Sequence, residues 1–156
     1  MTGQTLVIGI GNPARGDDAV GGQVARLVAV KAHHVRVIEL DYPSDALNAW
    51  SPEDTVVIID AVNTGGNPGD IHLTDVVANK LPAGNWSGGG DHALGLAAVL
   101  ELARALGKMP RKLVVVGIEA TRFNHGSSIT DAVEAAVPAA AVAVLAAVGG
   151  RKKKKR

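Results

Sequence analysis

The chain alternates short apolar runs with amphipathic segments. Continuous apolar runs of strand length indicate buried strands, and they cover residues 4–10, 35–40, 55–59 and 112–118. Apolar residues spaced three or four positions apart predict helices over residues 18–31, 44–50, 91–106 and 130–148. Residues 70–75 alternate apolar and polar positions, as an edge strand does. This order predicts an α/β protein, a three-layer α/β/α sandwich on a mostly parallel sheet, in one domain over residues 1–150.

Local signals place several helix boundaries. Ser44 can cap the short helix that starts there, and Asp91 can cap the helix that stops at Gly107. Pro138 is expected to kink or divide the last helix. The apolar run around it is interrupted by Glu134 and is shorter than the roughly 20 residues of a membrane span. We therefore expect no membrane segment.

Composition narrows the class of protein. The chain is 47% hydrophobic but only 3% aromatic, so aliphatic residues must fill the core. The absence of cysteine excludes a disulfide framework, a zinc finger and a cysteine nucleophile, and it fits the cytoplasmic location that we expect. Residues 151–156 are all basic, and without them 10 Lys and Arg face 15 Asp and Glu. We interpret that end as a disordered tail and expect no nucleic-acid partner for the acidic body.

A glycine-rich loop at residues 9–21 follows the first strand and reads G-I-G-N-P-A-R-G-D-D-A-V-G. A dinucleotide fingerprint would need a glycine at Ala14, and a Walker phosphate loop would need a lysine at Asp17. Because the adjacent carboxylates of Asp17 and Asp18 would repel a phosphate, the loop favours a cation over a nucleotide. The alternative is that both acids only begin the next helix, where its dipole favours negative charge.

Two further residues can complete a cation site with Asp18. Asp60 directly follows a buried run, and His92 begins a predicted helix after a glycine-rich stretch. Ligands of parallel α/β folds lie beyond the C-terminal ends of the strands, where these residues would meet. Two carboxylates and an imidazole suit Zn²⁺, Ni²⁺ or a similar divalent ion. The alternatives are a loop-pinning Asp60 and a structural His92. Weaker candidates are the other histidines, His33, His34, His72 and His125.

The ordered set of motifs resembles the hydrogenase maturation proteases, endopeptidases that process the large subunits of nickel-iron hydrogenases. Each motif alone is modest, but together they span nearly the whole chain in a specific order. They are the loop at residues 9–21, I-I-D-A at 58–61, D-H-A-L-G-L at 91–96, V-G-I-E at 116–119, F-x-x-G at 123–126 and I-T-x-A-V at 129–133.

The resemblance implies a five-stranded mixed, mostly parallel sheet of the phosphorylase/hydrolase-like type, with the fourth strand antiparallel. It implies a metal-dependent endopeptidase, of aspartic or unclassified type, that removes a C-terminal extension from the large-subunit precursor after nickel insertion. By motif, Asp18, Asp60 and His92 are the metal-binding and catalytic positions. The precursor would supply the nickel, and the free protein could hold another divalent metal. We expect a monomer whose partner is that precursor, with no membrane partner.

Two departures from the family pattern leave details open. Asp91 stands before His92, where serine or another small residue is common, and could tune or join the site. Residues 40–45 differ from family versions that help to choose the substrate, so the hydrogenase is not identified.

Two alternative functions remain. Peptidyl-tRNA hydrolases share the opening strand and turn, but they need a histidine-asparagine pair near residues 16–18 and a basic face for RNA. A non-catalytic nickel or large-subunit escort would use the same three residues as a protease.

Overall fold

The computed structural model describes residues 3–81, 85–86 and 95–149. Its sheet has the strand order β2-β1-β3-β6-β4, with a short β5 paired to the end of β3. The strands β2, β1, β3 and β6 are parallel, whereas β4, at the edge opposite β2, runs antiparallel to β6. Their bounds are β1 Thr5–Ile10, β2 Arg36–Leu40, β3 Thr55–Asn63, β4 Ile71–Asp75, β5 Asn85–Trp86 and β6 Lys112–Glu119. The predicted antiparallel fourth strand is thereby confirmed.

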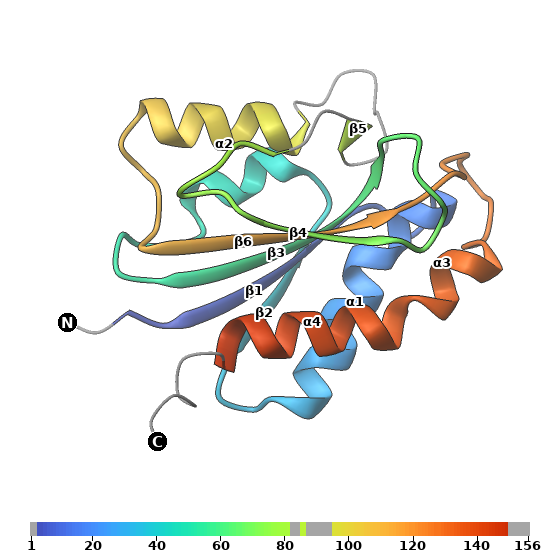
Figure 1. Cartoon of the computed structure of the whole chain (residues 1–156), viewed down its shortest axis with the longest axis horizontal. Coiled ribbons are helices and arrows are strands. Elements are labelled where there is room, and N and C mark those ends of the chain that lie inside the picture. Colours follow the sequence, from blue (N-terminus) through green and yellow to red (C-terminus); the bar gives the residue numbers. More distant parts are fainter. Residues whose placement is uncertain (1–2, 82–84, 87–94, 150–156) are drawn as a thin grey trace.

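Helices cover both faces of the sheet, which gives three layers (Figure 1). One face carries α1 (Val20–Lys31), α3 (Asp131–Ala135) and α4 (Val137–Gly149). The other face carries α2 (Leu96–Ala105) and the 3₁₀ helix η2 (Pro43–Asn48). The predicted α/β/α sandwich is confirmed.

Alternate residues of each central strand enter two separate cores. On β3, Val57 belongs to the core beneath α1 and α4, and Ile58 belongs to the core beneath α2. Both side chains are fully buried. Because both faces of the sheet are covered, the strands read as continuous apolar runs rather than as alternating ones.

Several predicted boundaries differ from the structure. β3 continues to Asn63, so Asp60 lies within the strand, opposite Gly117, instead of following it. η2 has Tyr42 at its N-cap and no side-chain capping bond, so the predicted Ser44 cap is wrong. α2 begins after an extended Gly95, so no helix runs unbroken from Asp91, which lies outside the described residues.

The division of the last helix is confirmed. α3 ends at Ala135 and α4 begins at Val137, with Pro138 in its first turn, where a missing amide hydrogen is tolerated. Within the described ranges, no helix is long and apolar enough to cross a membrane.

Candidate active site

The glycine loop brings the chain after β1 back against the end of that strand. Gly11 has φ +145°, and a Cβ there would stand 1.9 Å from the carbonyl oxygen of Asp18. At Gly21 a Cβ would stand 2.3 Å from the carbonyl oxygen of Ile10 and 2.7 Å from that of Ile59. The two glycines therefore serve close backbone packing, which holds the 3₁₀ helix η1 (Gly16–Ala19) and α1 against the strand ends.

Asp17 clamps the segment that follows β6. Its Oδ2 accepts hydrogen bonds from the backbone amides of Thr121 and Arg122, both at 3.0 Å. Its Oδ1 accepts one from the Thr130 amide at 2.7 Å and one from the Thr130 hydroxyl at 2.9 Å. The side chain is fully buried, and burial alone would raise its pKa, but these hydrogen bonds hold the pKa below the usual value. Asp17 is thus a structural carboxylate.

Asp18 has a very different environment. It is 2% exposed, and its Oδ2 accepts one hydrogen bond, from the Asn12 amide at 2.8 Å. Among the described residues its buried Oδ1 has no hydrogen-bond partner. Burial raises the pKa of Asp18, and the Asn12 amide and the Arg15 charge only partly oppose that effect. A buried carboxylate oxygen without a hydrogen-bond donor is suited to coordinate a cation.

Asp60 lies on β3, the neighbour of the strand β1 that leads into the Asp18 loop. Its side chain is on the face of the sheet that α2 covers. It is fully buried within β3, where the register pairs Ile59 with Gly9 of β1. η1, which carries Asp18, packs against β3. The structure therefore brings two of the three predicted ligands to the same end of the sheet.

His92, the third predicted ligand, lies outside the described residues. Within residues 3–81, 85–86 and 95–149, no three His, Asp or Glu side chains gather in an arrangement that could hold a metal. A site with three such ligands would therefore need His92 or another residue outside these ranges. The structure leaves the three-ligand site a prediction.

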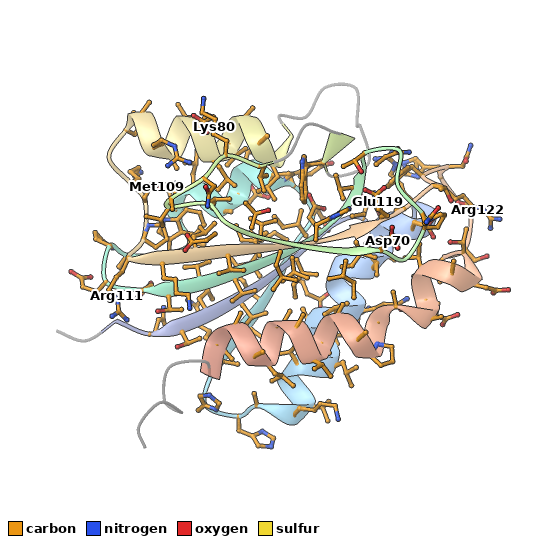
Figure 2. All side chains as sticks on the ribbon, in the orientation of Figure 1. Asp70, Lys80, Met109, Arg111, Glu119 and Arg122 are labelled. Atoms are coloured by element: carbon orange, nitrogen blue, oxygen red, sulfur yellow. The ribbon has the colours of Figure 1, made fainter. Side chains whose placement is uncertain are left out.

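Sequence reasoning missed a second polar cluster, built on Glu119. This carboxylate, 1% exposed at the end of β6, accepts hydrogen bonds from His72 Nε2 at 2.8 Å and from the amide and hydroxyl of Thr64. Figure 2 shows Glu119 at the same end of the sheet as Arg122. Burial alone would raise the pKa of Glu119, but the bonds from Thr64 and His72 hold it below the usual value. The sequence held one signal for this cluster, because His72 occupies a polar position of the alternating segment at residues 70–75.

Comparison with known proteins agrees with the fold and with the motifs. The family model described as hydrogenase maturation protease matches residues 30–147, a stretch that includes Asp60 and His92. The hydrogenase 2 maturation protease of Escherichia coli K12 is 31% identical over 153 residues, covering 92% of this chain and 89% of that protein.

Solved structures share the fold. The hydrogenase maturating endopeptidase HybD from Escherichia coli superposes with a TM-score of 0.76 at 26% identity, covering 96% of this chain and 94% of that one. The [NiFe] hydrogenase maturation protease HybD from Thermococcus kodakarensis gives 0.69 at 22% identity, with coverage of 91% and 97%. The resemblance that the motifs indicated is confirmed: the chain belongs to the hydrogenase maturation protease family.

Proposed function

We propose that this endopeptidase removes the C-terminal extension of a nickel-iron hydrogenase large-subunit precursor after nickel insertion. In this proposal Asp18, Asp60 and His92 recognise the nickel that the precursor carries. Family membership supports the peptidase activity and the class of substrate. The observation that carries the nickel recognition is the buried Oδ1 of Asp18, which no described residue satisfies.

The contrast with Asp17 explains why the second acid of the loop is the ligand. Asp17 accepts hydrogen bonds at both carboxylate oxygens, from Thr121 and Arg122 after β6 and from Thr130 before α3, so rotating it toward a metal would break that clamp. Within the described part of the chain, Asp18 accepts a hydrogen bond only from the Asn12 amide, through Oδ2, and keeps Oδ1 available. Carboxylate oxygen and imidazole nitrogen are ligands that Ni²⁺ accepts, so the proposed donor set fits the ion.

The chain on either side of His92 supports its place in the site. Trp86 lies on Gly117, whose added Cβ would stand 2.6 Å from the indole ring, and Gly117 pairs with Asp60. An added Cβ at Gly95 would stand 3.5 Å from the Trp86 carbonyl oxygen. The described residues that flank the His92 segment, Trp86 and Gly95, therefore lie close together, beside the strand position of Asp60.

The chemistry needs no covalent nucleophile, in keeping with the absence of cysteine. With the nickel-bearing segment of the precursor bound, a water molecule attacks the scissile carbonyl carbon. A carboxylate accepts the proton of that water, and the amide nitrogen leaves as an amine after it gains a proton. Polarisation of the carbonyl by the substrate's metal can assist the attack. We expect this reaction in the cytoplasm, by a monomer whose partner is that precursor.

The test uses purified protein and nickel-loaded precursor, with loss of the C-terminal extension followed by mass spectrometry. We expect nickel-dependent cleavage by the wild type, no cleavage by His92→Ala, and unchanged circular dichroism for that variant. His34→Ala, which changes an exposed histidine, is the matched control and should cleave normally. Normal cleavage by His92→Ala would refute the nickel-docking proposal. Stable binding without cleavage by the wild type would instead identify a non-catalytic escort.

A further inference from the structure

The Glu119 cluster fixes one end of an imidazole ring and leaves the other end available. The carboxylate of Glu119 is ionised at neutral pH and can only accept hydrogen bonds, so Nε2 of His72 must carry the hydrogen between them. The Nδ1 atom on the other side of the ring has no hydrogen-bond partner among the described residues. The His72 side chain is 33% exposed, whereas that of Glu119 is 1% exposed. The ring is therefore anchored at Nε2 and remains partly exposed to solvent.

The sheet register places His72 on the same face as Asp60. Gly117 of β6 pairs with Asp60 on one side and with His72 on the other, and directly paired residues share a face of the sheet. Neighbouring strands lie about 4.8 Å apart, so the Cα atoms of Asp60 and His72 are separated by about 10 Å. The ring of Trp86 lies on Gly117, between them.

We propose that His72 is a substrate-contact residue that hydrogen-bonds, through Nδ1, a main-chain peptide group of the precursor. This inference rests on the proposed function, because it takes the polypeptide around the nickel-bearing segment as the occupant of this end of the sheet. An extended peptide covers about 3.3 Å per residue, so roughly three residues span the distance from Asp60 to His72. The buried Trp86, 4% exposed, fills the space over Gly117 between the two side chains, so a precursor segment that reaches both Asp60 and His72 passes over Trp86 and uses at least that many residues.

Glu119 and Thr64 act in this arrangement as positioning residues. Thr64 binds both carboxylate oxygens of Glu119, through its amide and its hydroxyl, which orients the carboxylate toward His72. An added Cβ at Gly66 would stand 3.2 Å from the Glu119 carboxyl carbon, so the segment after β3 lies closely over this side chain. Glu119 is thus shielded from the precursor, whereas the His72 imidazole, whose side chain is 33% exposed, can contact it.

Two substitutions at one position separate substrate contact from structural support. In His72→Gln, the amide nitrogen reaches the place of Nε2 and can still donate to Glu119, but nothing replaces Nδ1. In His72→Asn, the shorter side chain keeps a polar atom near the place of Nδ1 and loses the bond to Glu119. The two variants therefore report separately on the contact through Nδ1 and on the hydrogen bond from Nε2 to Glu119. His34→Gln, at an exposed histidine, is the control.

The measurements are the Kd for nickel-loaded precursor, the kcat and KM of processing, and the Tm. For His72→Gln we expect a Kd and a KM raised by about 3- to 10-fold, the worth of one hydrogen bond, with kcat and Tm close to wild type. For His72→Asn we expect the larger loss of Tm and the smaller change in Kd. An unchanged Kd for His72→Gln, or a loss of Tm as large as that of His72→Asn, would overturn the proposal.

The binding measurement also separates this inference from the proposed function. If the wild type binds the precursor but does not cleave it, the proposed function fails, and the Kd of His72→Gln still tests the contact. If the wild type cleaves and His72→Gln binds and cleaves equally well, only the role of His72 fails.

Discussion

The adjacent acids Asp17 and Asp18 should respond in opposite ways to substitution. Asp17→Ala removes the acceptor of three backbone amides and one hydroxyl, which come from Thr121, Arg122 and Thr130. Hydrogen bonds to a charged group contribute about 1.5–3 kcal/mol each, and donors left without a partner add to the loss. Because the bonds share one carboxylate, we expect a total of about 3–5 kcal/mol. For a chain of this length that corresponds to a Tm lower by roughly 10–15 °C.

Asp18→Asn removes a charge that the folded protein stabilises poorly. The amide oxygen of the new side chain can still accept the hydrogen bond from the Asn12 amide, which Asp18 Oδ2 accepts at 2.8 Å. The position is 2% exposed and burial raises the pKa of the natural carboxyl, so a neutral group suits it at least as well. We expect the free energy of unfolding to stay within about 1 kcal/mol of wild type or to rise. Processing of the precursor should nevertheless be lost.

Urea unfolding followed by circular dichroism gives the stability of each variant, and mass spectrometry of the precursor gives its activity. Asp17→Asn is the control for shape, because it offers an amide donor where Thr121, Arg122 and Thr130 need acceptors, and it should lose stability as well. The reasoning is refuted if Asp18→Asn is destabilised as much as Asp17→Ala. It is equally refuted if Asp17→Ala unfolds at the wild-type urea concentration.

Two further predictions concern packing and pH. Gly21→Ala should cost about 1–3 kcal/mol or more, because its Cβ would stand 2.3 Å from the Ile10 carbonyl oxygen. In Gly22→Ala the new Cβ meets the movable side chains of Glu39 and Arg26, so this variant should be neutral or stabilising in thermal unfolding. Asp54 accepts the amides of Gln4 and Ser51, and its pKa, like that of Glu119, is held below the usual value despite burial. Asp54 and Glu119 therefore contribute stability that is complete above the ordinary carboxyl range near pH 4 and is lost as the pH falls through their lower folded pKa values. Urea midpoints that rose on acidification from about pH 5 to about pH 3 would contradict this prediction.

Sequence patterns predicted the interior of the sheet better than its ends. The core strands are continuous apolar runs because helices cover both of their faces, and such runs are recognisable without a structure. β3 was predicted too short because the run meets a polar residue at Asp60, although the strand continues to Asn63. Its last residues pair with β6 and β5, and pairing of that kind between distant segments leaves no local pattern. The two-residue β5 was missed for the same reason.

The candidate site was predicted in part for similar reasons. Motif order selected Asp18, Asp60 and His92, and the structure brings the first two to one end of the sheet. The distinction between Asp17 and Asp18 has a physical cause that local sequence does not contain, because the donors to Asp17 follow it by more than 100 residues. The pairing of His72 with Glu119 joins β4 to β6 across 47 positions, so a histidine in an alternating strand gave only a weak signal.

The degree of hydrogen bonding, rather than burial itself, distinguishes the roles of the buried acids. Asp17, Asp54 and Glu119 each accept hydrogen bonds from several donors, and each has a lowered pKa. Asp18 is buried to a similar extent, yet it accepts a single hydrogen bond from the residues that the structure describes, and its pKa is raised. A folded protein that satisfies three carboxylates could have satisfied this one by similar means, and burying it partly satisfied costs stability. The partly satisfied carboxylate lies at the end of the sheet where α/β proteins bind ligands. A loss of stability is retained in evolution where function requires it, so the position of Asp18 favours a functional role.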